Sequence, residues 1–138
     1  MVISGMCKDC ECERQKTTRR QISYAADNIL VHVKRFRKTN NGTSKNEAEV
    51  IPTPVYLQLK GRKIRYQVSS LVCHAGSLTS GHYTLCSKDQ DNWICFNDTQ
   101  VSRKVKIPTN GYIILLTRDA SYQTGVEEGE GAAPVKLT

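Results

Sequence analysis

Residues 64–73 read IRYQVSSLVC, and the shorter runs YTLC (83–86) and WICF (93–96) follow it closely. Ile64, Tyr66 and Val68 stand two residues apart before the first run becomes continuously apolar, which is typical of a β-strand. The spacers HAGSLTSG and KDQDN between the runs are rich in residues that favour turns. These stretches therefore predict three consecutive antiparallel strands joined by hairpin connections.

Three further apolar runs extend this sheet in both directions along the chain. They are ILVHV (29–33), PVYLQL (54–59) and GYIILL (111–116). We expect the first to be buried on both faces, because it is apolar and β-branched, and the second to be half exposed, because it alternates. The fold class is therefore mainly β, an antiparallel sheet of about six strands. Only ERQKTTRR (13–20) suggests a helix, and it has no apolar stripe with which to dock.

Length and composition indicate one folded domain. The chain has 138 residues, and its charge of +7 is concentrated in the first half. Residues 119–138 are rich in Gly, Ala, Glu and Ser, so we expect a domain over 1–118 and a disordered tail after it. The sequence shows neither a signal peptide nor an 18-residue apolar run, which predicts a cytoplasmic or nuclear protein that does not enter a membrane. A basic nucleic-acid-binding domain is disfavoured, because the strands supply few aromatic platforms for bases.

Polar residues that could carry chemistry stand at the ends of two predicted strands. His82 begins the strand that contains YTLC, and Asn97 and Asp98 end the strand that contains WICF. A hairpin through these strands brings Asn97 back roughly opposite His82. A histidine acts as a general base only when a partner fixes its ring and tautomer, and an asparagine or aspartate can do so. Gly81 would allow a close backbone approach or a positive φ at this point.

The same stretches resemble the C-terminal half of the catalytic domain of the ubiquitin-specific protease family. The resemblance covers about residues 7–118, through NILVHVKRFRK, VIPTPVYLQL, YQVSSLVCHAGSLTSGHYTL, WICFNDTQV and GYIILL in the family's order. It implies the palm of a papain-like domain, with His82 as general base, Asn97 as the residue that orients it and Asp98 as a neighbour that can share this role. The implied activity is cysteine-type hydrolysis of isopeptide or peptide bonds at the C-terminus of ubiquitin.

The resemblance also assigns two loops, 39–46 and 76–80, to the sides of the channel that admits the ubiquitin tail. Both are rich in Gly, Ser, Thr and Asn, although ordinary hairpin connections have the same composition. The residues expected at this substrate-binding channel are His74, Gly76, Ser80, Gly81 and Tyr83. His74 could equally be structural, and His32, inside ILVHV, is expected to be structural.

The six cysteines raise the question of a metal. Cys7 and Cys10 form a CxxC pair, which is half of a tetrahedral zinc site, and Cys12 could add a third ligand. In the family this position is similar to the second CxxC of a zinc-bearing finger, so a structural zinc is possible but not required. Cys73, Cys86 and Cys95 lie in apolar runs, and in a reducing compartment we expect them to be free, small buried hydrophobic residues.

The family's nucleophile has no counterpart in this sequence. That cysteine belongs to a Gly- and Asn-rich box that starts a helix, and none of the six cysteines has such a context. One hypothesis is therefore a deubiquitinase fragment that is active when an N-terminal half supplies the cysteine. The alternative is an inactive pseudoprotease that binds ubiquitin or a partner protein.

Overall fold

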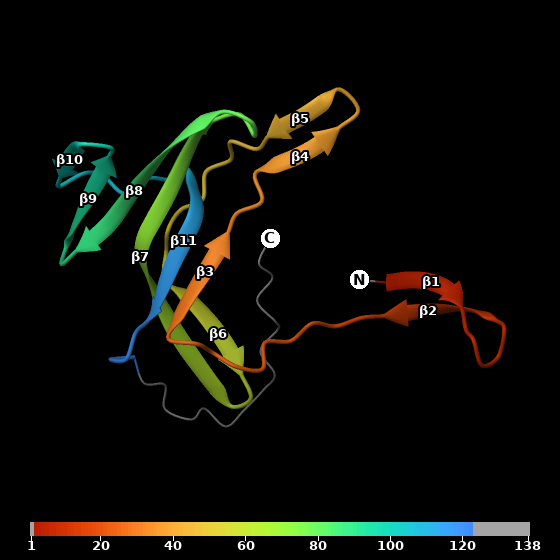
Figure 1. Ribbon diagram of the computed structural model, residues 1–138. Coiled ribbons are helices and arrows are strands. Elements are labelled where there is room, and N and C mark those ends of the chain that lie inside the picture. The colour runs from red at the N-terminus through yellow and green to blue at the C-terminus, as the bar shows by residue number, and fades with distance from the viewer. Residues whose placement is uncertain (1, 123–138) are drawn as a thin grey trace.

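The computed structural model describes residues 2–122, and within this range it contains eleven strands and no helix (Figure 1). The strands are β1 (Val2–Met6), β2 (Glu13–Thr17), β3 (Asn28–His32), β4 (Phe36–Thr39), β5 (Gly42–Lys45), β6 (Val55–Leu59), β7 (Arg62–Gly76), β8 (Gly81–Asp89), β9 (Asn92–Asn97), β10 (Gln100–Arg103) and β11 (Gly111–Arg118). In the described part of the chain no helix could cross a membrane.

One seven-stranded antiparallel sheet forms the body of the molecule. Its order is β10-β9-β8-β7-β11-β3, and β6 pairs with the first part of the long strand β7. All six strands predicted from the apolar runs belong to this sheet, so the mainly β prediction is confirmed. The three runs that decide the fold are its centre, because β7, β8 and β9 are joined by short turns that pair them in sequence.

The core lies on one face of the sheet. Tyr66 and Leu71 of β7 are its most deeply buried side chains, and Ile114 and Leu116 of β11 pack with them. Cross-strand partners such as Leu71 and Ile114 share a face, so the apolar positions of neighbouring strands meet there. The segments that connect β5 to β6 and β10 to β11 cover this face, placing Val50 and Ile107 against the cluster. This face is consequently closed by the chain's own loops.

Two expectations about the elements were wrong, and a third stretch, which only suggested a helix, forms a strand. The run at 29–33 is not buried on both faces, because β3 is an edge strand and Leu30 is 71% exposed. Residues 39–46, expected as a loop, contain the turn and the second strand of the β4–β5 hairpin, which is largely polar and so has no apolar periodicity. Residues 13–17 form the exposed strand β2 and not a helix.

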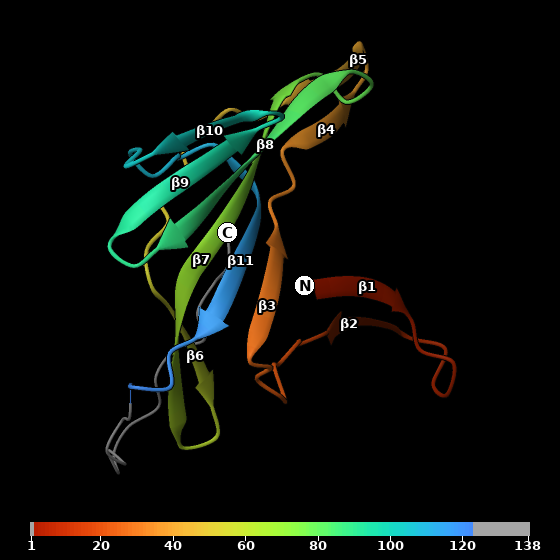
Figure 2. The ribbon, with the colours of Figure 1, turned by 60° about the vertical axis from the view of Figure 1, so that its left-hand side comes forward.

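The ribbon of β1 and β2 stands apart from the sheet, as Figures 1 and 2 show. Every residue of both strands is exposed, and the two strands pair only with each other within the described residues. A two-stranded ribbon is at best marginally stable in water. This ribbon therefore positions none of the residues of the sheet.

The first residues of the predicted tail are held to the body. Gln67 Nε2 donates a hydrogen bond to Asp119 Oδ2 at 2.8 Å, and Arg65 Nη1 lies 3.5 Å from the same oxygen. Hydrogen bonds from the hydroxyl and the backbone of Ser121, together with these contacts, keep the pKa of the Asp119 carboxyl below its usual value. Residues 123–138 lie outside the described part, where the tail stays a prediction.

Candidate functional site

The β8–β9 hairpin carries the predicted His82 and Asn97. Its ladder ends at the pair Leu85 and Phe96, and Asn97 is the next residue of β9. His82 is three residues before Leu85 and Asn97 is one residue after Phe96, so both side chains lie on the face opposite to that of the Leu85–Phe96 pair. His82 Nε2 and Asn97 Oδ1 are 2.6 Å apart, so the predicted meeting of the two side chains is confirmed.

This contact fixes the state of the imidazole. Asn97 Oδ1 is a carbonyl oxygen, so it accepts the Nε2–H of His82 and leaves the lone pair of a neutral ring on Nδ1. The His82 side chain is 50% exposed, which leaves the ring accessible to another group. The pair has the chemical form of a base and its orienting partner, lacking only a nucleophile beside Nδ1.

Asp98 contributes less than Asn97. Its carboxylate lies 3.9 Å from His82 Nε2, beyond hydrogen-bond distance, and its side chain is 78% exposed. Its backbone turns away with a φ of 52°, in the left-handed region. A contact of this kind attracts only a protonated ring and is screened by salt, so the geometry makes Asn97 the orienting partner.

His74 explains why residue 81 is a glycine. A Cβ at Gly81 would overlap the His74 imidazole, so the glycine is needed for close packing and not for a positive φ. His74 is buried, and its ring also contacts Tyr83 and Tyr112, with ring centroids 4.8 and 5.6 Å away. Its Nδ1 has no protein hydrogen-bond partner. His74 thus packs directly behind the backbone that presents His82.

The two loops predicted to flank a channel meet at a cavity of about 410 Å³. Its lining residues are Phe36, Thr43, Lys45, Glu47, Gly76, Ser77, Leu78 and Thr79. Gly76 adopts a φ of 114°, which favours glycine, and Ser77 N donates to Ser80 O at 2.7 Å to close the turn. The adjacency of the loops is therefore confirmed, whereas their part in binding a tail stays a prediction.

Two cations that the sequence did not single out hold this region together. Lys45 Nζ donates to His74 O at 2.7 Å, which ties β5 to the histidine-bearing strand β7. Arg35 is buried, and its guanidinium donates to the carbonyl oxygens of Gly111, Asn46 and Ala48 at 3.0, 3.0 and 2.8 Å. In the sequence Arg35 stands beside Phe36, whereas Lys45 stands among polar residues, and neither setting reveals such distant partners.

The remaining predicted side chains have mixed surroundings. Tyr83 is 56% exposed on the face opposite the core, so it is available for contacts. Ser80 is exposed in the β7–β8 turn. His32 is exposed rather than buried, and its ring meets Tyr112 edge-on with centroids 4.8 Å apart. None of the side-chain contacts described above joins Tyr83, Ser80 or His32 to His82.

The cysteines correct one prediction. Cys86 and Cys95 are joined by a disulfide bond, as are Cys10 and Cys12, so the expectation of free thiols at 86 and 95 was wrong. Composition treats cysteines singly, whereas the strand register makes Cys86 and Cys95 direct Cα partners. Cys73 is buried and free as expected, and burial raises the pKa of its thiol.

A complete zinc site is not present within residues 2–122, where no three His, Cys, Asp or Glu side chains are grouped to hold a metal. Cys7 is free, and hydrogen bonds from the backbone of Asp9 and Cys10 lower the pKa of its thiol. Cys10 is bonded to Cys12 and offers no thiolate in this form. The arrangement does not fit a tetrahedral zinc, and the zinc prediction for Cys7 and Cys10 would need reduction and further ligands.

Known proteins resemble this chain in sequence. A family model described as "Ubiquitin carboxyl-terminal hydrolase" matches residues 4–116. The chain is 30% identical over 125 residues to ubiquitin carboxyl-terminal hydrolase 10 of Saccharomyces cerevisiae, covering 82% of this chain and 16% of that protein. It is 26% identical over 104 residues to ubiquitin carboxyl-terminal hydrolase 21 of Mus musculus, covering 70% of this chain and 18% of that protein. The chain thus spans about a sixth of the length of these relatives.

Solved structures share the fold. A SAGA DUB module bound to ubiquitin aldehyde matches with a TM-score of 0.65 and 21% identity, covering 85% of this chain and 30% of the matched chain. A yeast SAGA DUB module matches with a TM-score of 0.68 and 22% identity, covering 83% and 28%. At these identities the likeness establishes the arrangement of strands.

Proposed function

Because this chain belongs to the ubiquitin carboxyl-terminal hydrolase family, we propose that its sheet supplies the general-base half of a cysteine-type deubiquitinating site. The substrate is an isopeptide or peptide bond at the C-terminus of ubiquitin. His82 is the general base and Asn97 orients it. The observation that carries this proposal is the 2.6 Å contact between His82 Nε2 and Asn97 Oδ1.

The geometry assigns each nitrogen of His82 a task. Asn97 holds the Nε2–H, so Nδ1 takes the proton from a cysteine thiol and the thiolate attacks the carbonyl carbon of the scissile bond. The imidazolium then returns this proton through Nδ1 to the leaving amine. Asn97 keeps the ring in one orientation during both transfers. Its side chain is uncharged, so this exposed residue does so without a carboxylate charge.

The nucleophile comes from outside the sheet. Within residues 2–122 the free thiols are Cys7 and Cys73. Cys7 lies in the turn between β1 and β2, in the ribbon that stands apart from the sheet, and Cys73 is buried with a raised pKa, which disfavours the thiolate. We therefore assign the nucleophile to a complementary N-terminal half that carries the cysteine box.

A docking surface for that half is available on the face opposite the core. Leu85, Phe96 and Val101 are successive cross-strand partners on this face, and all three are exposed. Leu30 and Tyr83 extend the same face along β3 and β8. A contiguous apolar surface of this kind marks an interaction site.

The cavity between the β4–β5 hairpin and the β7–β8 turn supports ubiquitin as the ligand class. Its loops present backbone and hydroxyl groups, which suit an extended peptide tail. We assign Gly76, which lines the cavity, together with Ser80, Gly81, Tyr83 and His74 to the binding of this tail. A cytoplasmic or nuclear location follows from this assignment. Loss of the nucleophile altogether would leave an inactive ubiquitin-binding domain, which is the second candidate because neither free thiol suits catalysis.

A ubiquitin probe with a C-terminal electrophile tests the proposal. The full chain is mixed with a supplied N-terminal half, and labelling of the half's cysteine is followed by mass. We expect labelling with the wild-type chain, and a loss of roughly 10²–10⁴-fold in rate with His82→Gln. His32→Gln, which changes an exposed histidine on the edge strand, is the matched control and keeps full labelling. Ubiquitin binding without labelling supports the inactive candidate instead. The absence of both labelling and ubiquitin binding rejects both candidates.

A further inference from the structure

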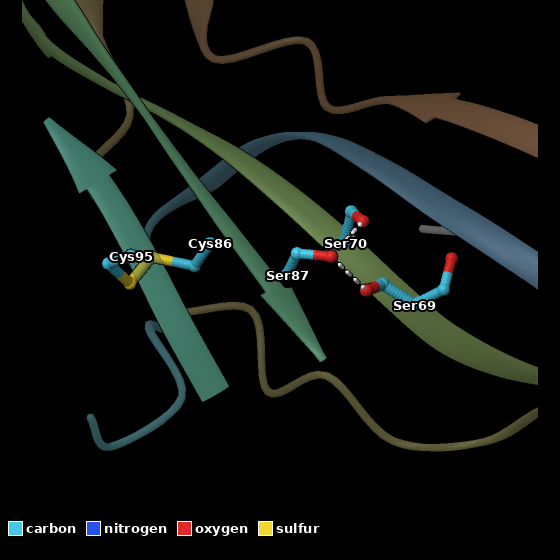
Figure 3. The surroundings of a disulfide bond; sticks show 5 residues. All are labelled: Ser69, Ser70, Cys86, Ser87 and Cys95. Carbon is cyan, nitrogen blue, oxygen red and sulfur yellow. Dashed lines mark hydrogen bonds between the residues drawn. A yellow bond between two sulfur atoms is a disulfide. The ribbon is translucent and has the colours of Figure 1, made fainter. Parts of the chain in front are cut away.

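The β8–β9 ladder contains a disulfide bond that no step of the proposed chemistry uses. Cys86 and Cys95 are direct Cα partners with their Cα atoms 4.1 Å apart, and their sulfur atoms are bonded (Figure 3). Directly opposed residues approach this closely at the non-hydrogen-bonded positions of an antiparallel pair, where side chains are nearest. The register of the hairpin therefore brings the two sulfur atoms together.

This crosslink lies next to the end of the ladder that carries His82 and Asn97. The ladder ends at Leu85 and Phe96, one position beyond the cysteine pair. Cys86 is four residues after His82, and Cys95 is two residues before Asn97, so all four side chains share one face. The disulfide is thus a covalent bond between β8 and β9 close to the 2.6 Å contact of His82 with Asn97.

The two strands are not equally secured. Strand β8 pairs with β7 along the whole stretch from Ser87 to Gly81, and Ser87 Oγ lies 3.1 Å from Ser70 Oγ across that pair (Figure 3). In the described part of the chain, strand β9 pairs only with β8 and with β10, a short strand whose residues are all exposed. Without the disulfide, β9 can shift against a fixed β8, which moves Asn97 and leaves His82 in place.

We propose that Cys86 and Cys95 form a reversible thiol–disulfide modification site whose redox state sets how firmly Asn97 is held against His82. The disulfide form holds the orienting contact, and the dithiol form loosens it. The effect on hydrolysis rests on the function proposed above, whereas the modification and its effect on the imidazole do not.

A low-molecular-weight disulfide, such as glutathione disulfide, serves as the oxidant. Cys95 is only half buried and Cys86 is buried, so the Cys95 thiolate attacks a sulfur atom of the oxidant first and releases one glutathione. The Cys86 thiolate then attacks Cys95 Sγ in this mixed disulfide and releases the second glutathione. Two protein thiols lose two protons and two electrons, and the S–S bond of the oxidant is reduced to two thiols.

Thiol mapping and NMR on the full chain test the site without any enzyme assay. The chain is equilibrated in buffers with different ratios of reduced to oxidised glutathione, alkylated, and mapped by mass spectrometry. Nitrogen-15 spectra of the His82 ring are recorded in both states. We expect a linked peptide containing Cys86 and Cys95 in the oxidised state, with ring shifts of a single Nε2–H tautomer. In the reduced state the two nitrogen shifts move toward the averaged values of a free imidazole.

Two variants separate this site from the other disulfide. Cys10→Ser with Cys12→Ser removes the bond in the ribbon and should leave the redox response of His82 intact. Cys86→Ser with Cys95→Ser should hold the His82 shifts at the reduced values at every glutathione ratio. If the latter variant does not fold, the reduced wild-type chain gives the same comparison.

Three results would overturn the proposal. They are full alkylation of Cys86 and Cys95 at every ratio, crosslinking confined to Cys10 and Cys12, and identical His82 shifts in the oxidised and reduced states. A redox response of His82 in a chain that never supports ubiquitin-probe labelling would confirm this site and reject the enzyme function, so the two failures are distinguishable.

Discussion

The His74 imidazole occupies the space into which a Cβ on residue 81 would project. The same Cβ would stand 2.6 Å from the carbonyl oxygen of Ala75, which is backbone and cannot move aside as a side chain can. The start of β8 therefore approaches the end of β7 more closely than any other residue type would allow. His82 is the next residue, so its position depends on this approach.

Gly81→Ala should consequently destabilise the chain and displace His82. We expect a loss of roughly 1–3 kcal/mol in the free energy of unfolding, the usual cost of overpacking, measured by urea denaturation. Gly5→Ala is the matched control, because a Cβ there meets nothing within 4 Å. Adding His74→Ala should recover part of the loss and leave the clash with the Ala75 carbonyl. Strictly additive effects of the two changes would contradict the packing described here.

Asn97 and Asp98 should differ in their importance for labelling by a ubiquitin probe. Asn97→Ala removes the oxygen 2.6 Å from His82 and should slow labelling by about 10-fold or more, up to the whole general-base contribution. Asp98→Asn removes a distant exposed charge and should change the rate by less than about 3-fold, with an effect that fades at high salt. Rates are compared at two salt concentrations in the reconstituted mixture. The reverse order of effects would make Asp98 the orienting residue.

Arg35 should be among the most sensitive positions for folding. Arg35→Met removes the donor to three carbonyl oxygens, those of Gly111, Asn46 and Ala48. An unpaired buried acceptor costs about 1–3 kcal/mol, so we expect a loss of about 3 kcal/mol or more in the free energy of unfolding. Chemical denaturation measures this loss, and Arg37→Met, at an exposed position of β4, should stay within about 0.5 kcal/mol of wild type. Equal effects of the two changes would show that the Arg35 contacts are not formed.

The two free thiols should react at different rates and over different pH ranges. Backbone hydrogen bonds lower the pKa of Cys7. Burial raises the pKa of Cys73, and this effect exceeds the opposite effect of the Arg35 charge. Because the thiolate is the reactive form, alkylation of Cys7 in the native chain should reach its full rate at a lower pH than that of a free cysteine. Cys73 should stay unmodified until denaturant unfolds the chain. Timed alkylation with peptide mapping checks both, and rapid native labelling of Cys73 would contradict its burial.

The sequence predicts the centre of the sheet and the contact between His82 and Asn97 because both depend on local order. Short turns join β7, β8 and β9, so alternation and turn length nearly fix which residues face each other, including His82 and Asn97. The exposed edge position of β3 was missed, because an apolar run does not reveal how many neighbours its strand has. The β4–β5 hairpin was missed because its residues are polar. Contacts such as Arg35 with Gly111 join residues far apart in sequence, and no local pattern encodes them.

The hydrogen bond from Lys45 to the carbonyl oxygen of His74 has a kinetic consequence for the cavity beside it. It joins β5, on one side of the cavity, to β7, which leads into the β7–β8 turn on the other side. A peptide that threads between them must either fit the existing width or break this bond, in which case the two walls separate in one concerted step. Their opening rates, measured by relaxation dispersion, should then be equal, and Lys45→Met should make them independent.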